Sequence, residues 1–284
     1  MALLRLAALL SVLITFGIVL ALLVPSIGFF REVPISDFLL GTRWAPRFAE
    51  ASFGVLPLVT ATLWCAAIAL LVAVPLGLGA AIYLSEYAKP AVRKILKPVL
   101  EVLAGIPTVI FGLFALTFIQ SVVLKGWLNL SGGAFSVLAA GLVMGVMILP
   151  TVASISEDAM SAVPNSLRQG SAALGANRMQ TSLRVVFPAA ISGILASVIL
   201  GVSRAVGETM IVAIAAGNLA QVVTNPMQQG QTMTGFIANA ALGDSRVGSL
   251  EYNTLFAVGL LLFTITLVIN FISVAVVRKF RQAY

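Results

Sequence analysis

The stretch QGSAALGANRMQTSLRVVFP, residues 169–188, lies between two long apolar runs of the sequence. It is polar and rich in small residues, and Gly175 divides it into two segments that can each form a short helix. The apolar runs on either side, about 134–155 and 189–216, are each long enough to cross the hydrocarbon core of a bilayer. We therefore expect a compact helical knob that two spans hold at a membrane surface.

The composition of the whole chain indicates an integral membrane protein. Of its 284 residues 60% are hydrophobic and 10% are charged, whereas about a quarter of the residues of a soluble domain are charged. The chain has no histidine, which excludes imidazole as a base or a metal ligand, and the single cysteine, Cys65, excludes an intrachain disulfide. No cluster of carboxylates indicates a metal site. The net charge of +7 fits basic cytoplasmic loops better than nucleic-acid binding.

Six apolar segments reach the length of roughly 20 residues that a membrane span needs. The predicted fold is therefore an all-α integral membrane protein with six transmembrane helices. Residues 1–54 are expected to form the first helix and an outer loop, and residues 55–284 a core of five helices. The expected spans are about 6–30, 55–82, 99–123, 134–155, 189–216 and 254–277.

The distribution of Lys and Arg predicts that both termini lie in the cytoplasm. With the N-terminus inside, eleven basic residues lie on the inner side and five on the outer side, and Arg204 remains within a span. The inner set is Arg5, Lys89, Arg93, Lys94, Lys97, Arg168, Arg178, Arg184, Arg278, Lys279 and Arg281. The outer set is Arg31, Arg43, Arg47, Lys125 and Arg246.

The sequence offers no ATP-binding motif of its own. Gly170 and Gly175 have the first spacing of a phosphate-binding loop, G-x-x-x-x-G-K-[ST], but Ala176 and Asn177 follow where Lys and Ser or Thr are required. Without histidine, a Ser-His-Asp or Cys-His set cannot form either. We therefore expect a transport subunit rather than an enzyme, with no cofactor bound by this chain.

The spacing within residues 169–188 resembles the coupling loop of ATP-binding-cassette (ABC) importer permeases, E-A-A-x-x-x-G followed by x9-I-x-L-P. The corresponding positions are Gln169, Gly170, Ser171, Gly175, Val185, Phe187 and Pro188. The first triplet departs from the pattern, since Gln169 keeps the length of Glu but not its charge. The resemblance implies that an inner loop of about 156–188 is gripped by a separate ATPase, which carries ATP and Mg and pushes the attached spans. The alternative is a surface loop of small residues.

Other stretches are similar to permeases of the phosphate-specific Pst importer. They are LPLVTATLWCAAIALLVAVPLGLGAAIYLSEYA (56–88), LEVLAGIPTVIFGLFAL (100–116) and SRAVGETM (203–210), and DFLLGTRWAPRF (37–48) resembles the PstC-type subunit more than the PstA-type. The resemblance implies a type I importer permease (MetI-like) fold that moves inorganic phosphate inward by alternating access. It also implies a bacterial inner-membrane heterodimer with a PstA-like permease, two copies of a PstB-like ATPase and an extracytoplasmic PstS-like phosphate-binding protein.

Arg204 and Glu208 are full charges inside the fifth predicted span. On a continuous helix, residues four apart share a face and can pair, and a charge at this depth costs a few kcal/mol on insertion scales. One reading is a buried pair that fixes helix packing. In the other, Arg204 lines the path and offers its planar donor fork to a phosphate oxygen, while Glu208 holds it in place. Ser203 and Thr209 are candidate neighbours, and Thr108, which follows a predicted break at 105–107, is a candidate lining residue.

Three alternatives to a phosphate permease remain open from the sequence. The first is a permease of the same class for another oxyanion, such as phosphonate, sulfate or molybdate. The second is a secondary carrier that works without ATP, which the coupling-loop spacing and the lack of an obvious internal repeat disfavour. The third is a membrane scaffold without transport, in which the intramembrane charges would be hard to explain.

Overall fold

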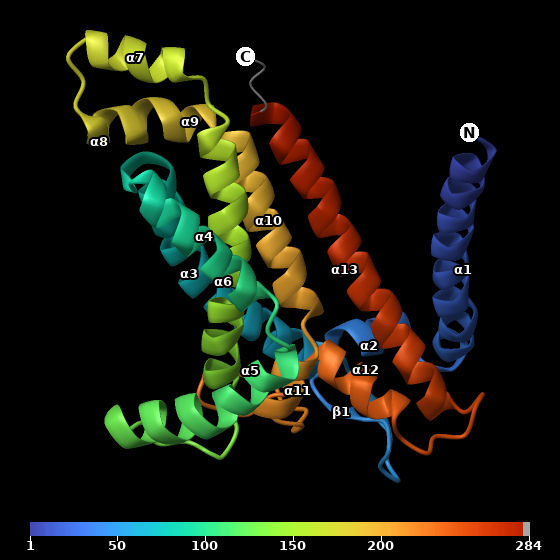
Figure 1. Cartoon of the computed structure of the whole chain (residues 1–284). Coiled ribbons are helices and arrows are strands. Elements are labelled where there is room, and N and C mark those ends of the chain that lie inside the picture. Colours follow the sequence, from blue (N-terminus) through green and yellow to red (C-terminus); the bar gives the residue numbers. More distant parts are fainter. Residues whose placement is uncertain (281–284) are drawn as a thin grey trace.

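The computed structural model describes residues 1–280 and shows a mostly helical chain (Figure 1). Five helices are long and apolar enough to cross a membrane, and a pair of helices bent by 72° provides a sixth candidate span. The all-α membrane fold is therefore confirmed. Arg281, counted above among the inner basic residues, lies outside the described residues. The five helices are Leu3–Glu32, Leu56–Tyr87, Thr108–Trp127, Val137–Ser161 and Leu250–Lys279, and the pair is Arg178–Ala189 with Ile191–Gly207.

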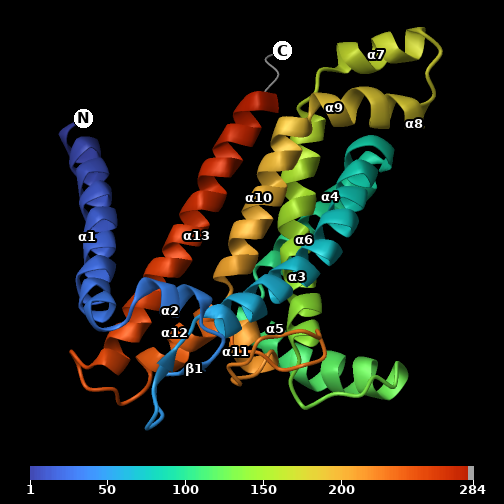
Figure 2. The same ribbon diagram turned by 180° about the vertical axis from the view of Figure 1, so that it is seen from behind.

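The long helices place the two described ends of the chain on one side of the molecule. Figures 1 and 2 show the start of α1 and the end of α13 on the same side as the short helices α7 to α9, which follow α6. The bounds are α1 Ala2–Glu32, α3 Leu56–Ile82 with its π-helical extension η1 Tyr83–Tyr87, α6 Val137–Ser161, α7 Asn165–Ala173, α8 Arg178–Thr181, η3 Ser182–Val186, α9 Phe187–Ala189 and α13 Leu250–Phe280.

The third predicted span, 99–123, is wrong at its start. A separate helix, α4 (Pro90–Ala104), ends at Gly105, and the chain restarts at α5 (Thr108–Phe114), which continues into the π-helical η2 (Ala115–Trp127). Pro107 causes the break because it lacks an N–H and disfavours helical geometry in the residue before it. The candidate span therefore begins at Thr108, and α4 packs beside α6.

The fifth predicted span, 189–216, is also wrong as one continuous helix. Helix α10 covers Ile191–Gly207, Glu208 is extended (φ −67°, ψ 132°), and a second helix, α11, covers Met210–Ala215. In addition, α6 continues to Ser161, so the inner loop begins after the predicted position 156. Both differences arise because hydropathy reports which residues are apolar and does not report where the backbone turns.

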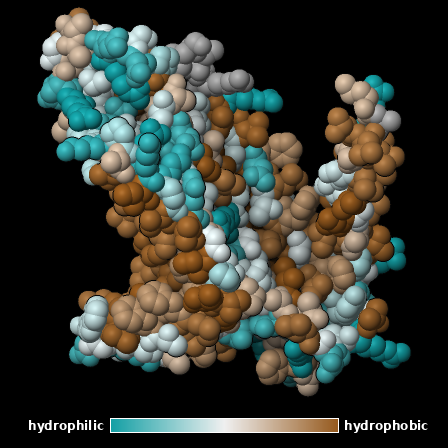
Figure 3. All heavy atoms as spheres, viewed as in Figure 1, coloured by the Kyte–Doolittle hydropathy of each residue, from teal (hydrophilic) through white to brown (hydrophobic). Residues whose placement is uncertain are grey.

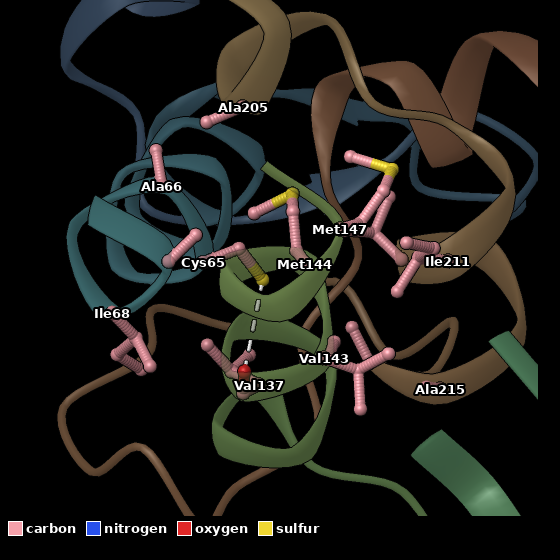
Figure 4. Packing of buried hydrophobic residues seen from close by; sticks show 14 of the residues in the cluster. Cys65, Ala66, Ile68, Val137, Val143, Met144, Met147, Ala205, Ile211 and Ala215 are labelled. Carbon is pink, nitrogen blue, oxygen red and sulfur yellow. Dashed lines mark hydrogen bonds between the residues drawn. The ribbon is translucent and has the colours of Figure 1, made fainter. Parts of the chain in front are cut away.

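The core lies where α3, α6, α10 and α11 meet. Two glycines on α6, Gly141 and Gly145, let α3 approach closely: a Cβ on Gly141 would lie 2.7 Å from the Ile68 Cβ, and one on Gly145 would lie 2.9 Å from the Ala69 carbonyl oxygen. Figure 4 shows side chains of all four helices interleaved in the buried cluster, among them Cys65, Met144, Met147, Ala205 and Ile211.

A short hairpin lies at the end opposite to α7–α9 (Figure 2). After α2 (Ile35–Leu40), strands β1 (Trp44–Ala45) and β2 (Ser52–Phe53) pair antiparallel, with Trp44 opposite Phe53. The base of the hairpin requires two glycines, since a Cβ on Gly41 would lie 2.6 Å from the Gly54 Cα. Helix α12, Met233–Ala241, packs beside this region through Phe236.

Hydrophobic side chains cover much of the surface along the long helices, and hydrophilic ones gather over α7 and α8 (Figure 3). The contrast between these two surfaces is the one expected of a membrane protein whose short helices extend into water.

Candidate functional site

Arg204 lies in the last turn of α10 and is half-buried. Its guanidinium Nη1 donates a hydrogen bond to the Thr151 Oγ1 of α6 at 3.2 Å, the one hydrogen bond that the guanidinium makes within residues 1–280. A cation at this end of a helix also interacts favourably with the helix dipole. The guanidinium is therefore oriented by one neighbour and keeps donors free for another group.

Glu208 does not pair with Arg204, so the predicted ion pair is wrong. Because α10 ends at Gly207, Glu208 leaves the face that carries Arg204, and no ion pair joins the two charges in the described chain. Its Oε1 instead accepts hydrogen bonds from the backbone N–H of Met210 at 3.1 Å and of Ile211 at 3.3 Å. The carboxylate thus satisfies the free N–H groups at the start of α11.

Glu208 also connects the break to α12. Its carbonyl oxygen accepts a hydrogen bond from the Thr234 Oγ1 of α12 at 2.6 Å. Thr209, a predicted site residue, donates from Oγ1 to the Gly207 carbonyl at 3.3 Å and so contributes to the same turn. Glu208 and Thr209 therefore build the break between α10 and α11.

Ser203 and Thr108 are the remaining predicted path residues, and they differ in their relation to Arg204. Ser203 donates from Oγ to the Asn270 Oδ1 of α13 at 3.3 Å, which brings a second helix next to the Arg204 region. Thr108 is the half-buried first residue of α5, and no hydrogen bond joins it to Arg204 in the part of the chain that the structure describes.

Sequence reasoning missed Thr151 and Asn270. A polar amide within the apolar segment 254–277 could have indicated Asn270.

The polar groups of α6, α10 and α13 do not suit a lipid environment. Asn270 is exposed in the single chain although it lies in a span, and Arg204 and Ser203 are half-buried. Within membranes, such groups face the interior of a bundle or a water-filled cavity. This face of α10 is therefore directed toward a path or toward a partner span.

The coupling segment forms the predicted pair of short helices joined at Gly175. Gly175 has φ +82°, a left-handed conformation that suits glycine. Asn177 then forms a capping box with Gln180. The Ser171 and Thr181 hydroxyls, 2.9 Å apart, connect the two helices into a hairpin, which we call the α7–α9 hairpin.

The surface of the hairpin suits a partner. Leu174, at its tip, is 91% exposed, although a large apolar side chain is costly to leave in water. Of the predicted coupling residues, which did not include Leu174, Gln169, Gly170 and Pro188 are exposed, and Val185 and Phe187 are half-buried. No atom lies within 4 Å of a Cβ built on Gly170, so an alanine would fit at that position.

Arg168 anchors the hairpin to two spans. Its Nη2 lies 2.8 Å from the Glu86 Oε1 and 2.9 Å from the Met160 carbonyl, and its Nη1 also bonds to the Val163 carbonyl. Glu86 is buried at the end of α3–η1, and Met160 belongs to the last turn of α6. Sequence reasoning treated Arg168 only as a topology determinant, and Glu86, far away in the sequence, offered no local signal of the pairing.

A second ionic cluster fastens α4 to the end of α6 that leads into the α7–α9 hairpin. Glu157 is fully buried and pairs with Lys97, 2.8 Å away, and with Arg93, while Lys97 also pairs with Asp158. Burial alone would lower the pKa of the Lys97 ammonium, but its hydrogen bonds with Asp158 and Glu157 raise that pKa above its ordinary value. This end of α6 is therefore connected to α4 and, through Arg168, to the hairpin.

The sequence of the chain matches a known protein family. Residues 73–282 match the family described as "Binding-protein-dependent transport system inner membrane component". The chain is 38% identical to the probable ABC transporter permease protein YqgH of Bacillus subtilis, over 85% of this chain and 76% of that protein. It is 34% identical to the phosphate transport system permease protein PstC of Haemophilus influenzae, over 87% and 82% respectively.

The fold also matches solved importer structures. A chain of the bacterial alginate ABC transporter, crystallised with a pentasaccharide-bound periplasmic protein, aligns with a TM-score of 0.67. The alignment covers 95% of this chain and 92% of that chain, at 17% sequence identity. At this identity the likeness concerns the fold alone.

Proposed function

Because the chain belongs to the family of binding-protein-dependent transport system inner membrane components, it is a multi-pass permease subunit of an ABC importer, and we propose that it imports inorganic phosphate. The observation that carries the proposal is the guanidinium of Arg204, held by Thr151 on a face of α10 unsuited to lipid. The similarity to the phosphate permease of Haemophilus influenzae supports phosphate as the cargo.

The free donors of Arg204 give the path a weak and specific contact for an oxyanion. The guanidinium presents a planar fork that matches two oxygens of a phosphate. Thr151 restricts the rotation of this fork, so less conformational freedom is lost when the anion arrives. Asn270 accepts from Ser203 and keeps its amide N–H groups as further donors on the neighbouring helix. Glu208 contributes by fixing the break and moderates the charge only at longer range.

The α7–α9 hairpin supplies the mechanical connection. Its last helical segment leads directly into α10 through the 72° bend. From Ile191 to Arg204 the helix extends roughly 20 Å at 1.5 Å per residue. A displacement of the hairpin by an ATPase therefore moves the helix that carries Arg204, which is the coupling that alternating access requires.

The assembly we propose follows from this role. A second, PstA-like permease subunit completes the path, two PstB-like ATPase subunits bind ATP and Mg²⁺ and grip the hairpins, and a PstS-like protein delivers phosphate from outside. The subunit lies in the bacterial inner membrane with both termini in the cytoplasm, on the side of the α7–α9 hairpin. Residues 1–54 then add the first span and an outer loop to the permease core formed by 55–284.

Another oxyanion is the second candidate cargo, because a guanidinium also binds sulfate, molybdate or phosphonate. ATP hydrolysis by the complete complex in lipid distinguishes these cargoes. We expect the phosphate-loaded binding protein to raise the hydrolysis rate several-fold, and the same protein incubated with sulfate to leave the basal rate unchanged. Stimulation by sulfate or molybdate in place of phosphate would show that the cargo is wrong, while the permease fold and its coupling would stand.

A further inference from the structure

One buried polar atom has no partner in the described chain. Among residues 1–280, the Trp44 indole Nε1 is the buried side-chain nitrogen or oxygen without a hydrogen bond. Trp44 is only 5% exposed, and its ring is held edge-on by Phe38 and Phe236, with ring centroids 6.3 and 4.9 Å away. Since buried N–H groups nearly always have an acceptor, this indole N–H is a candidate contact for a group that the single chain does not supply.

The same tryptophan lines a pocket that also holds the guanidinium groups of Arg43 and Arg47. The pocket has a volume of about 420 Å³, and no acidic residue is among those that line it. Arg43 is exposed and has no carboxylate partner among the described residues, whereas the Arg47 Nε lies 2.7 Å from the Glu251 Oε1. The amides of Asn218, Gln231 and Asn239, which carry both donors and acceptors, complete the polar wall, and the Asn239 Nδ2 donates to the Asn218 Oδ1 at 2.8 Å. A group that accepts hydrogen bonds and carries negative charge would complement this wall.

The pocket lies beside a stiff, protruding hairpin. The Arg43 carbonyl accepts hydrogen bonds from the Gly54 N–H at 3.0 Å and from the Ser52 Oγ at 2.8 Å, which fixes the strand that carries Trp44. Beyond this base, Phe48 also lines the pocket and is 69% exposed. Figure 2 shows β1 at the end opposite to the α7–α9 hairpin. Phenylalanine and arginine are both enriched at the cores of protein–protein interfaces.

We propose that this pocket receives an acidic side chain of the extracytoplasmic binding protein. One carboxylate oxygen accepts from the Trp44 Nε1, the carboxylate pairs with Arg43, and Phe48 packs against the apolar surface around it. The binding protein is the fitting partner because the family depends on one and because the pocket lies on the face away from the α7–α9 hairpin. The inference rests on that dependence and does not require phosphate to be the cargo.

Two substitutions in the full complex, reconstituted in nanodiscs, test the proposal. Trp44→Phe removes the N–H and keeps an aromatic ring, and Arg43→Gln removes an exposed charge. We expect each to raise the Kd of the loaded binding protein about tenfold, in the range of charged interface contacts. Basal ATP hydrolysis should remain unchanged. Lys125→Gln, an outer cation that does not line the pocket, is the matched control and should leave the Kd unchanged.

Two results would overturn the proposal. The first is an unaltered Kd in Arg43→Gln and Trp44→Phe. The second comes from a Trp64→Phe, Trp127→Phe background, in which Trp44 is the only tryptophan of this subunit. A change in emission caused by millimolar free phosphate without binding protein, present in this background and lost when Trp44→Phe is added, would make the pocket a cargo site. If a sulfate-loaded binding protein stimulates ATP hydrolysis and Arg43→Gln still raises its Kd, the phosphate proposal is contradicted and the docking proposal stands.

Discussion

We expect the replacement of Arg204 with Gln to abolish most phosphate uptake by a complex that still assembles. A charge-assisted hydrogen bond contributes about 1.5–3 kcal/mol, so its loss in the path corresponds to a decrease on the order of tenfold to a hundredfold in uptake. Glutamine keeps a polar, uncharged side chain on the half-buried face of α10, so the complex is expected to assemble. The measurement is ATP-dependent uptake of radiolabelled phosphate into proteoliposomes, with co-purification of all subunits as the test of assembly.

Two companion variants separate charge from geometry. Arg204→Lys keeps the positive charge without the planar fork and should give an intermediate rate. Thr151→Val removes only the hydroxyl that orients the guanidinium, so uptake should fall less than in Arg204→Gln. Wild-type uptake by Arg204→Gln would remove the guanidinium from the transport mechanism and leave it a packing residue.

We expect Arg168→Gln to uncouple ATP hydrolysis from transport. The substitution breaks the contact that joins the α7–α9 hairpin to Glu86 and to the end of α6. A hairpin that is still gripped but no longer anchored cannot move the spans, so uptake should fall at least about tenfold, in line with the loss of a buried ion pair. Basal ATP hydrolysis should persist, while its stimulation by the binding protein should disappear. Deleting 169–188 outright should release the ATPase from the complex.

A charge swap distinguishes coupling from simple misfolding. Arg168→Gln leaves Glu86 buried without its partner, which is destabilising in itself. The double variant Glu86→Arg, Arg168→Glu restores opposite charges and should recover part of the stimulation that each single variant loses. Lys89→Gln, an exposed cation nearby, should behave as wild type. Full stimulation by the loaded binding protein in Arg168→Gln would contradict the anchoring role.

The sequence indicated the spans because the apolar residues of a membrane helix are contiguous along the chain. Their breaks depend on local backbone chemistry and on distant partners. The first break, at Pro107, could be predicted because proline disfavours helix. The break at Gly207 depends instead on the Glu208 carboxylate, which caps α11, and on Thr234, which donates a hydrogen bond to the Glu208 carbonyl. A hydropathy window averages over such a turn, so 189–216 was predicted as one helix.

The same distinction holds for the site: single residues could be predicted from the sequence, but contacts between distant residues could not. A charge inside an apolar run is visible in the sequence, so Arg204 could be singled out. Its partner could not, because pairing with Glu208 presumed a continuous helix, and Thr151 lies on α6. Gly175 was predictable because a left-handed turn depends mainly on the residue itself. The contact between Glu86 and Arg168 could not be predicted, because it forms only when η1, α6 and α7 come together in the fold.

Access of water to the face of α10 beside Arg204 can be measured with a thiol at position 203. Cys65 is the only cysteine, so Cys65→Ala with Ser203→Cys leaves a single reporter next to Arg204. The lipid-facing control combines Cys65→Ala with Leu13→Cys, which places the thiol on the exposed surface of α1. The reagent is a water-soluble, membrane-impermeant thiol probe applied from either side, with and without trapped nucleotide.

If Arg204 lines the path of the imported anion, the thiol of the Ser203→Cys variant reacts, the side from which it reacts changes with the nucleotide state, and phosphate slows the reaction. The thiol of the Leu13→Cys control stays unreactive under the same conditions. A thiol at position 203 that no soluble reagent modifies in any state, or that reacts from both sides regardless of nucleotide and phosphate, would contradict the account.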